Sequence, residues 1–298
     1  MVERTTGQSA TEIFVAHRNL LFTVAYEMLG SAADAEDVLQ ETWLRWTTVD
    51  LDTVREPRAY LVRITTRQAL TQLRKLGRRK ESYVGPWLPE PLLTTPDVAE
   101  DVELADSVSM AMLLVMETLT PAERAVFVLR EVFSLEYEEI AEAVDKTPAA
   151  VRQIAHRARN HVGARRPRGI TSQAEARGAT EAFQKAVTTG DLQGLFDLLA
   201  PDVVFIGDGG GVVQATPQPL HGADVVSRFL AEGLSHLPGF VAMETAYVNG
   251  GLAVIMRAGD TVDTIVTMQT ENGLITGIYV IRNPEKLSWV QEEIAMAR

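Results

Sequence analysis

Two stretches of basic residues that contain no acid are the part of this sequence best suited to bind a nucleic acid. The first covers residues 58–80 and the second covers residues 146–174. Basic side chains neutralise phosphates and release bound counterions, and this release supplies affinity for DNA. We therefore expect two surfaces that follow the DNA backbone, and the alternative of two solvated helix faces stays open. The basic residues are Arg58, Arg63, Arg67, Arg74, Lys75, Arg78, Arg79 and Lys80 in the first stretch, and Lys146, Arg152, Arg157, Arg159, Arg165, Arg166 and Arg168 in the second.

The overall charge hides these stretches. The 298-residue chain carries a formal net charge of −12, and most of the excess acid lies after residue 171. A uniformly acidic protein would repel DNA, so the distribution of charge matters more than its sum. We expect the part after residue 171 not to bind DNA.

Composition also limits the chemistry. The chain has no cysteine, and its five histidines are scattered, so disulfides, thiolate catalysis and a zinc site are not expected. We expect no metal and no cofactor. The polar start MVERTTGQSATE and the lack of a long apolar run predict a cytoplasmic protein that does not enter a membrane.

The first basic stretch lies on the third of three predicted helices. Apolar residues recur at helical spacing from about residue 10, Gly30 ends the first helix, and Ser31 caps the second. The first turns of the second helix are acidic, which also suits the helix dipole. A third helix from Pro57 to Arg79 turns its basic residues outward.

The second basic stretch lies on a predicted helix-turn-helix. Thr120 and Glu123 form a capping box, a short helix capped by Ser134 follows, and Thr147 caps the last helix after a turn at 144–146. This arrangement places a recognition helix in the DNA major groove. One face of the last helix is apolar, with Val151, Ala155, Ala158 and Val162, and the opposite face carries Arg152, Gln153, His156 and Arg159.

Between the two helical parts lies a stiff segment, PWLPEPL at residues 86–92. Proline fixes φ and favours extended geometry, so this segment presents Trp87 either as a cap on a neighbouring domain or as an anchor for another part of the chain. After residue 172 a helical segment is followed by β-rich runs with the turns DGGG, NGG and ENG, which predicts an α+β domain.

Several motifs resemble those of a known family. The segment SAADAEDVLQETWLRW at residues 31–46 closely resembles region 2 of bacterial extracytoplasmic-function (ECF) sigma factors, and residues 121–162 resemble region 4. The last domain is similar to SnoaL-type members of the cone-shaped α+β superfamily that includes nuclear transport factor 2 (NTF2). WLPEP, DGGG and NPEKL together resemble the sigma J-like subgroup.

The resemblance implies a multidomain protein with two all-α sigma domains and one α+β domain. Its expected parts are region 2 as a helical bundle at 10–80, the linker with WLPEP at 81–104, region 4 as a helix-turn-helix at 105–166, and a SnoaL/NTF2-like regulatory domain at 172–298. It implies a factor that directs RNA polymerase to promoters and starts transcription, regulated in cis by its C-terminal domain.

The resemblance also implies three sets of functional residues. Contacts with the clamp helices of core RNA polymerase are expected from Asp34, Glu36, Asp37, Gln40, Glu41 and Trp43. Contacts with the −10 element are expected from Arg63, Arg67, Gln68, Thr71, Arg74, Lys75, Arg78 and Arg79. Gln68 and Thr71 replace Asn and Asp of many relatives, which puts the −10 base preference in doubt. Contacts with the −35 element are expected from Thr147, Arg152, Gln153, His156, Arg157 and Arg159, with Arg152 suited to guanine and Gln153 to adenine.

A fourth set is expected to join the C-terminal domain to region 2 or the linker. Glycine allows close backbone approach, which suits the DGGG motif to such a contact, although a plain hairpin turn is the alternative. The set is Trp87, Leu88, Pro89, Glu90, Pro91, Asp208, Gly209, Gly210, Gly211, Asn283, Pro284, Lys286 and Leu287.

Two other functions stay open. The C-terminal domain could make the protein a DNA-localised enzyme, with Asp208, His221, Asp263 and Tyr279 as acid and base groups, or a sensor of an unknown small ligand in its pocket. A duplex-binding repressor that acts without polymerase is the other. We expect no catalysis, because no two of these four residues have a spacing that forces them together.

Overall fold

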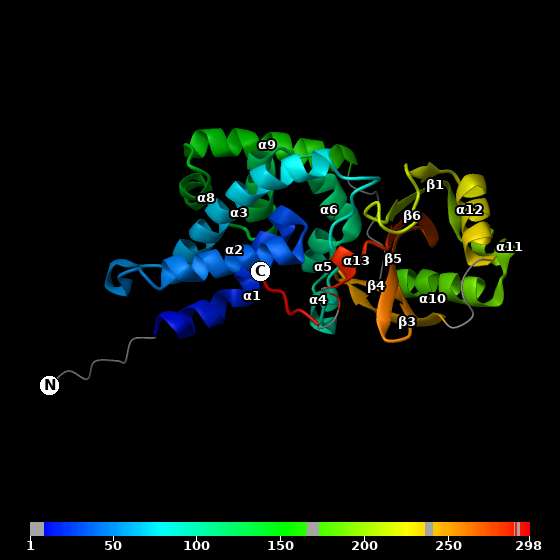
Figure 1. Ribbon diagram of the computed structural model, residues 1–298. Helices are drawn as coiled ribbons and strands as arrows, with labels where there is room; N and C mark the ends of the chain where they lie inside the picture. Colours follow the sequence, from blue (N-terminus) through cyan, green and yellow to red (C-terminus); the bar gives the residue numbers. More distant parts are fainter. Residues whose placement is uncertain (1–8, 166–172, 236–240, 289, 291–292) are drawn as a thin grey trace. The chain divides into compact units, whose positions relative to one another are not determined.

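The computed structural model describes residues 9–165, 173–235, 241–288, 290 and 293–298 (Figure 1). Its packing divides the chain into two units, which we describe separately. Unit 1 comprises Met1–Arg78, Met116–Arg165 and Ala295–Arg298, and unit 2 comprises Arg79–Val115 and Arg166–Ile294. The linker therefore belongs with the C-terminal domain, and so do residues 105–115, which were expected in region 4. Most of the two helical parts expected as regions 2 and 4 belong together.

The first helical part of unit 1 contains α1 (Ala10–Leu29), α2 (Ala32–Trp46), a 3-10 turn at Leu51–Thr53 and α3 (Pro57–Glu81). The predicted starts of these helices and the end of α1 are confirmed, and α3 continues to Glu81, beyond the predicted end at Arg79. Gly30 ends α1 with a φ of 68°, and the Ser31 hydroxyl accepts a hydrogen bond from the Asp34 amide (3.1 Å). The indole of Trp46 is fully buried and donates to the carbonyl of Ala10 (2.8 Å), which ties the end of α2 to the start of α1.

The second helical part contains the end of α6 (Met110–Glu117), α7 (Pro121–Phe127), a π-helical turn at Val128–Val132, α8 (Tyr137–Val144) and α9 (Pro148–Arg165). The capping box of Thr120 and Glu123 is confirmed, and Thr147 caps α9 through the amide of Ala150 (3.2 Å). Ser134 was expected to cap α8, and this is wrong. The cap is Glu136, because Ser134 adopts a positive φ of 52° as the chain leaves the π-helical turn.

Unit 2 is built on one six-stranded sheet, which confirms the α+β class. Its strands are β1 (Leu199–Asp208), β2 (Leu220–His221), β3 (Val241–Val248), β4 (Gly251–Ala258), β5 (Thr261–Glu271) and β6 (Leu274–Ile281). The order is β2-β1-β6-β5-β4-β3. Strands β1 and β6 pair in parallel, and the other neighbouring pairs of this order are antiparallel. The hairpin turns predicted at NGG and ENG join β3 to β4 and β5 to β6. The helices of this unit are α4 (Pro96–Glu100), α5 (Val102–Val108), the first part of α6, α10 (Gln173–Thr189), α11 (Leu192–Asp197), α12 (Ala223–Ser235) and α13 (Pro284–Leu287).

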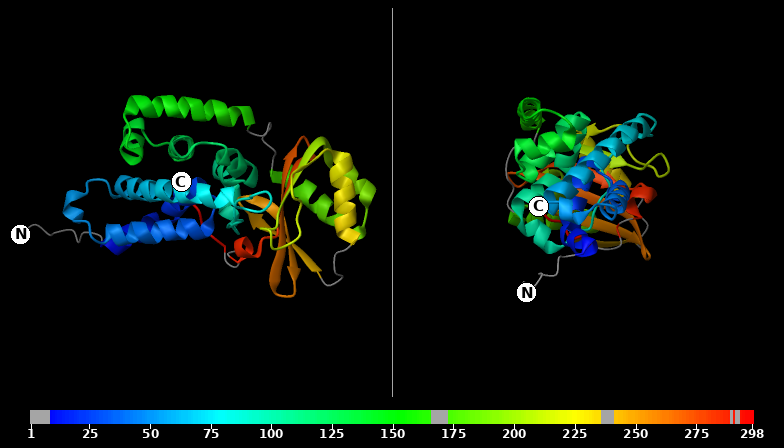
Figure 2. Two further views of the ribbon diagram at one scale, coloured as in Figure 1. Left: turned by 45° about the horizontal axis from the view of Figure 1, so that its top comes forward. Right: turned by 90° about the vertical axis from the view of Figure 1, so that its left-hand side faces the viewer.

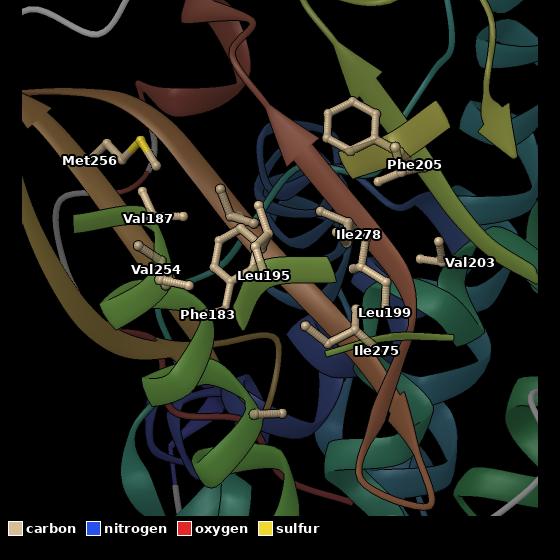
Figure 3. Packing of buried hydrophobic residues seen from close by; sticks show 14 residues of the cluster. Phe183, Val187, Leu195, Leu199, Val203, Phe205, Val254, Met256, Ile275 and Ile278 are labelled. Atoms are coloured by element: carbon tan, nitrogen blue, oxygen red, sulfur yellow. The ribbon is translucent and has the colours of Figure 1, made fainter. Parts of the chain in front are cut away.

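The sheet packs apolar side chains on two sides. On one side, Phe183, Leu195 and Phe205 belong to a buried cluster that joins α10, α11 and α12 to the strands (Figure 3). A second cluster contains Leu88 from the linker and Leu287 from α13. The linker is therefore part of the core of unit 2.

The turn between β3 and β4 holds the linker through a buried asparagine. Asn249 is 2% exposed and has a φ of 53°. Its side chain accepts a hydrogen bond from the Leu92 amide (3.1 Å) and donates one to the Val108 carbonyl (3.0 Å). Its own amide donates to the Leu92 carbonyl (2.9 Å). One side chain thus fixes the backbone of the linker and of α5 against the sheet.

Replacing Asn249 by alanine is predicted to destabilise unit 2 by about 2–4 kcal/mol, because two buried backbone groups lose their partners. Asn272→Ala is the matched control, since Asn272 has the same φ of 53° in an exposed turn. Asn272→Ala should lower the free energy of unfolding by only about 1–2 kcal/mol, which is the cost of placing alanine in the left-handed backbone conformation. Urea unfolding of the full-length variants measures both, and equal losses would contradict the role of the Asn249 side chain.

Candidate functional site

The acidic start of α2 offers only some of its predicted polymerase contacts. Asp37, Gln40 and Glu41 are exposed, and Glu36 pairs with Arg18 (2.6 Å). Trp43 is half-buried, with its ring 5.1 Å from that of Phe14.

Asp34 requires a correction within this set. Its carboxylate is 5% exposed and accepts a hydrogen bond from the side chain of Gln72 on α3 (2.6 Å). This carboxylate holds α2 against α3 and is turned away from a surface partner. We therefore leave Asp34 out of the proposed polymerase contact.

The predicted −10 surface follows α3. Arg67, Thr71, Arg74 and Lys75 are exposed, and Arg63 is half-buried. The Thr71 hydroxyl donates to the carbonyl of its own helix (3.0 Å), and Gln68 lies against the guanidinium of Arg45. The side chains of Arg78 and Arg79 lie outside the described part of the structure.

Part of this basic surface is occupied by the helix-turn-helix. The guanidinium of Arg63 donates to the carboxylate of Glu142 on α8 (2.8 Å), and Arg67 donates to the Glu142 carbonyl (2.7 Å). The two helical parts of unit 1 therefore contact each other through residues expected to hold promoter DNA.

A buried arginine also joins these two parts. Arg124 on α7 is 1% exposed and donates to the carbonyl of Glu27 on α1 (2.9 Å) and to the carboxylate of Glu117 (2.8 Å). The C-terminal residues add a further contact, because the amide of Ala297 donates to the Thr23 hydroxyl of α1 (3.1 Å). These buried and exposed contacts hold the two helical parts of unit 1 together, and we call this the closed arrangement of unit 1.

The predicted faces of α9 are confirmed. Val151, Ala155, Ala158 and Val162 are buried, whereas Arg152, Gln153, His156, Arg157 and Arg159 are exposed. Each arginine of this face pairs with an acid of a neighbouring helix or turn. Arg152 pairs with Glu138 (2.9 Å), Arg157 with Glu123 (3.5 Å) and Arg159 with Glu131 (3.2 Å). Exposed ion pairs contribute little stability, so DNA phosphates can replace the acids at low cost. Arg166 and Arg168 lie outside the described residues.

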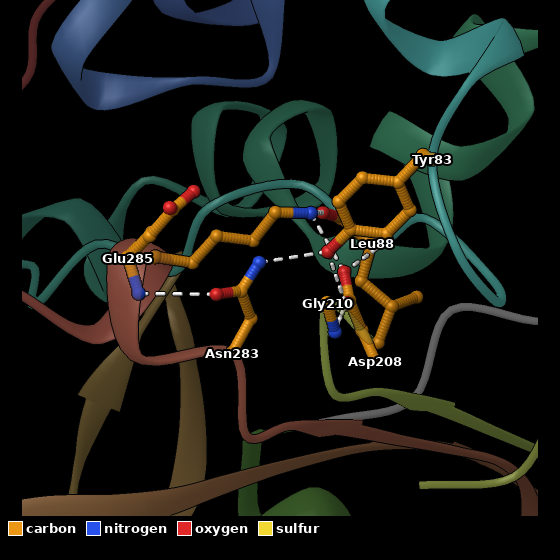
Figure 4. A network of polar contacts seen from close by, with 7 residues as sticks. Tyr83, Leu88, Asp208, Gly210, Asn283 and Glu285 are labelled. Atoms are coloured by element: carbon orange, nitrogen blue, oxygen red, sulfur yellow. Dashed lines mark hydrogen bonds and ion pairs between the residues drawn. The ribbon is translucent and has the colours of Figure 1, made fainter. Parts of the chain in front are cut away.

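In unit 2, Asp208 collects polar partners from the linker and from its own turn (Figure 4). Its carboxylate is fully buried at the end of β1. It accepts hydrogen bonds from the amide of Leu88 (2.8 Å), the amide of Gly210 (3.0 Å) and the hydroxyl of Tyr83. Burial is the main cause that raises the pKa of Tyr83 above its usual value, and the Asp208 carboxylate raises this pKa further. The hydroxyl therefore keeps the proton that it donates.

Lys286 of α13 completes this cluster. Its ammonium lies 2.6 Å from the Asp208 carboxylate, donates to the carbonyl of Leu88 and sits 3.4 Å from the centre of the Trp87 ring. The Lys286 side chain is 4% exposed. Burial lowers its pKa, and the Asp208 carboxylate opposes this effect. Both the amide and the carbonyl of Leu88 are therefore bound by one buried ion pair, which we call the Asp208–Lys286 latch.

Close packing around the DGGG motif explains why its three positions are glycines. A Cβ on Gly209 would lie 2.0 Å from the Val213 carbonyl, one on Gly210 would lie 2.5 Å from the Asn283 amide, and one on Gly211 would lie 2.8 Å from Val84. Gly210 and Gly211 also have positive φ values of 64° and 72°. The motif brings the backbone close to both the linker and NPEKL, whereas a plain hairpin turn would not need this approach.

The four residues considered for catalysis make separate contacts and do not form one site. Asp208 belongs to the latch, Asp263 pairs with Arg282 (3.2 Å), and Tyr279 donates to Gln269 (3.1 Å). Burial raises the pKa of Tyr279 to about 12. His221 is exposed on the two-residue strand β2. No hydrogen bond or ion pair of the described residues joins any two of the four.

Comparison with known proteins defines the class of the chain. Residues 13–79 match the family model Sigma-70 region 2, and residues 109–162 match the model Sigma-70, region 4. The chain is therefore an RNA polymerase sigma factor, which binds promoter DNA and starts transcription.

Full-length relatives identify the branch of this class. The chain is 35% identical to the ECF RNA polymerase sigma factor SigJ of Mycobacterium tuberculosis strain H37Rv, over 92% of both chains. It is 32% identical to the probable ECF sigma factor SigI of the same organism, over 94% of this chain and 95% of the relative. The crystal structure of SigJ superposes with a TM-score of 0.76 over 95% of this chain and 99% of the other. The protein belongs to the ECF sigma factors.

Sequence reasoning missed several residues of these contacts. Arg124, Glu142 and Tyr83 were not among the expected functional residues, and the structure places all three in these contacts. The spacing of Tyr83 and Trp87, whose rings meet edge to face at 4.6 Å, is a signal that was available.

Removing both members of the latch is predicted to cost less than the sum of the two single removals. Lys286→Met leaves a buried carboxylate without its cation, and Asp208→Asn leaves a buried ammonium without its anion, so each should cost about 3–5 kcal/mol. The double variant should cost less than the sum by at least about 1 kcal/mol. Hydrogen exchange of residues 83–95 measures the opening of the linker in each variant. Additive losses would contradict direct coupling of the two charges.

Among the stretches of chain that the structure describes, no helix has the length and apolar character required to span a membrane, and no group of three potential metal ligands comes together.

Proposed function

We propose that the C-terminal domain of this sigma factor regulates promoter recognition in cis by binding the linker between regions 2 and 4. The observation that carries this proposal is the Asp208–Lys286 latch, which holds Leu88 by both backbone groups. Asn249 holds Leu92 in the same way, and Leu88 and Leu92 are fully buried. The linker is thus bound at two points four residues apart.

Linker length explains why this binding would matter. The names of the −10 and −35 elements place them roughly 25 base pairs apart, about 85 Å along the duplex. A fully extended chain of the length of residues 81–104 reaches about 80 Å. A linker that is folded into α4 and α5 and held on the sheet spans much less. We therefore expect release of the linker to make simultaneous binding of both elements easier.

The closed arrangement of unit 1 supports the same proposal. Arg63 and Arg67 belong to the proposed −10 surface, and both contact Glu142 of region 4. We assign contacts with core polymerase to Glu36, Asp37, Gln40, Glu41 and Trp43, and contacts with DNA to the exposed basic residues of α3 and α9. Release of the linker would let region 4 leave region 2 and free these residues.

We propose that the protein acts in the cytoplasm, where RNA polymerase works, and that its C-terminal domain regulates transcription without catalysing a reaction. The relatives that cover the chain are sigma factors. The alternative of a ligand sensor requires space beside the sheet, and the cluster around Phe183 and Leu195 fills part of that side with apolar side chains.

Run-off transcription with purified core polymerase tests the proposal. Lys286→Met is predicted to raise transcription from a cognate promoter at least tenfold, because its expected cost of about 3–5 kcal/mol exceeds the 1.4 kcal/mol that shifts the equilibrium of the bound linker tenfold. Lys185→Met is the matched control, since Lys185 is exposed on α10. It should transcribe like the unmodified protein.

Transcription by Lys286→Met equal to that of the unmodified protein, with core binding intact, would overturn the regulatory role. Failure of both proteins to bind core polymerase or to initiate would instead contradict the assigned polymerase surface.

A further inference from the structure

Tyr137, the first residue of α8, lies among three arginines of region 4. The guanidinium of Arg130 lies over its ring at 4.6 Å and that of Arg152 at 5.3 Å. Arg159 donates a hydrogen bond to its hydroxyl (3.1 Å). Two of these arginines come from the recognition helix α9, and Arg130 comes from the π-helical turn that precedes α8. One half-buried aromatic side chain therefore contacts three cations from the two elements that flank α8.

The chemistry of this contact suits residues that must bind another partner. A guanidinium that lies over an aromatic face is attracted by the ring, and its N–H donors remain in the plane of the group. Arginine also loses considerable rotamer freedom when it binds a base or a phosphate. A ring that restricts the guanidinium beforehand reduces this loss, which is the physical meaning of preorganisation.

The surroundings leave room for a DNA phosphate. Arg130 and Arg159 line a hollow of about 440 Å³ together with Glu131, Ser134, Glu136 and Tyr137. Glu131 pairs with Arg159 at 3.2 Å, and Glu136 lies 3.6 Å from Arg130. Both pairs include an exposed acid, so a phosphate can take the place of either carboxylate.

The helix-turn-helix geometry places this cluster at the DNA. In this motif the second helix enters the major groove and the first helix crosses the sugar–phosphate backbone. Tyr137 begins the first helix, and Arg152 lies in the first part of the second helix, where base edges are read. The cluster therefore spans the boundary between backbone contacts and base contacts.

We propose that Tyr137 is a positioning residue for −35 recognition. Its ring holds Arg152 in the orientation that reads a base edge, and its hydroxyl holds Arg159, beside Arg130, in the orientation that binds a backbone phosphate. The inference rests on the assignment of α9 as the recognition helix and is independent of regulation by the C-terminal domain.

The test uses holoenzyme reconstituted with core polymerase and a promoter library randomised at the −35 element. Tyr137→Phe removes only the hydroxyl, and is expected to weaken binding about tenfold without changing the selected sequence. It should also reduce the slope of binding against salt by up to about 1, because one phosphate contact is lost. Tyr137→Leu removes the ring as well. It is expected to relax discrimination by about fivefold or more at the base position that Arg152→Ala relaxes.

Two controls separate positioning from folding. Tyr247→Phe removes a hydroxyl that accepts a bond from Arg177 (3.0 Å) in unit 2, and should change neither affinity nor sequence preference. The Tyr137→Leu/Arg152→Ala double variant should discriminate no worse than Arg152→Ala alone.

An unchanged preference in Tyr137→Leu, or relaxation at base positions other than that of Arg152, would overturn the proposal. If Tyr137→Leu does not fold, the cycle of Tyr137→Phe with Arg159→Ala decides. Losses of affinity that are not additive support positioning through the hydroxyl, and additive losses contradict it.

Discussion

The burial of the Asp208 carboxylate is the constraint on which unit 2 depends. A carboxylate that is removed from water must be paired and hydrogen-bonded, and here the partners come from three separate segments of the chain. Lys286 supplies the charge, Tyr83 and Leu88 supply linker donors, and Gly210 supplies a donor from the adjacent turn. Loss of any one segment leaves a buried charge without its full set of partners.

This constraint explains why the linker has one position on the sheet. A buried ion pair is weak evidence for stability, and its best-attested use is to fix register. Displacing Leu88 by one residue would move its amide away from Asp208 and its carbonyl away from Lys286. The prolines of WLPEP keep the segment extended, and Trp87 lies beside the Lys286 ammonium, so stiffness and register act together.

The charged contacts of the protein fall into two kinds with different consequences. The pairs of Arg152, Arg157 and Arg159 are exposed, and DNA can replace their acids without leaving a buried charge. The Asp208–Lys286 pair and the Arg124 contacts are buried, so breaking them is costly. The first kind suits surfaces that must exchange partners, and the second suits contacts that hold a state until another interaction compensates for their loss.

Local signals were enough to predict the end of α1 and the starts of α2 and α9. Gly30, Ser31 and Thr147 act through neighbours three or four residues away, so their roles are readable from spacing. The exposed face of α9 followed from its apolar period, and the resemblance to the sigma J-like subgroup indicated that the C-terminal domain would contact the linker. The roles of Asp34, Arg124 and Glu142 were not predictable, because each depends on which distant helix packs against it. The cap of α8 was missed because the π-helical turn delays the start of the helix.

The distance between regions 2 and 4 is the measurement that tests the central claim most directly. The chain has no cysteine, so cysteines introduced at the exposed positions Asp52 and Asn160 give one dye on each region for single-molecule energy transfer. The latch predicts a short distance in the full-length protein and a shift of population to long distances in Lys286→Met. An identical distance distribution in the two proteins would show that the linker contact does not hold the regions together.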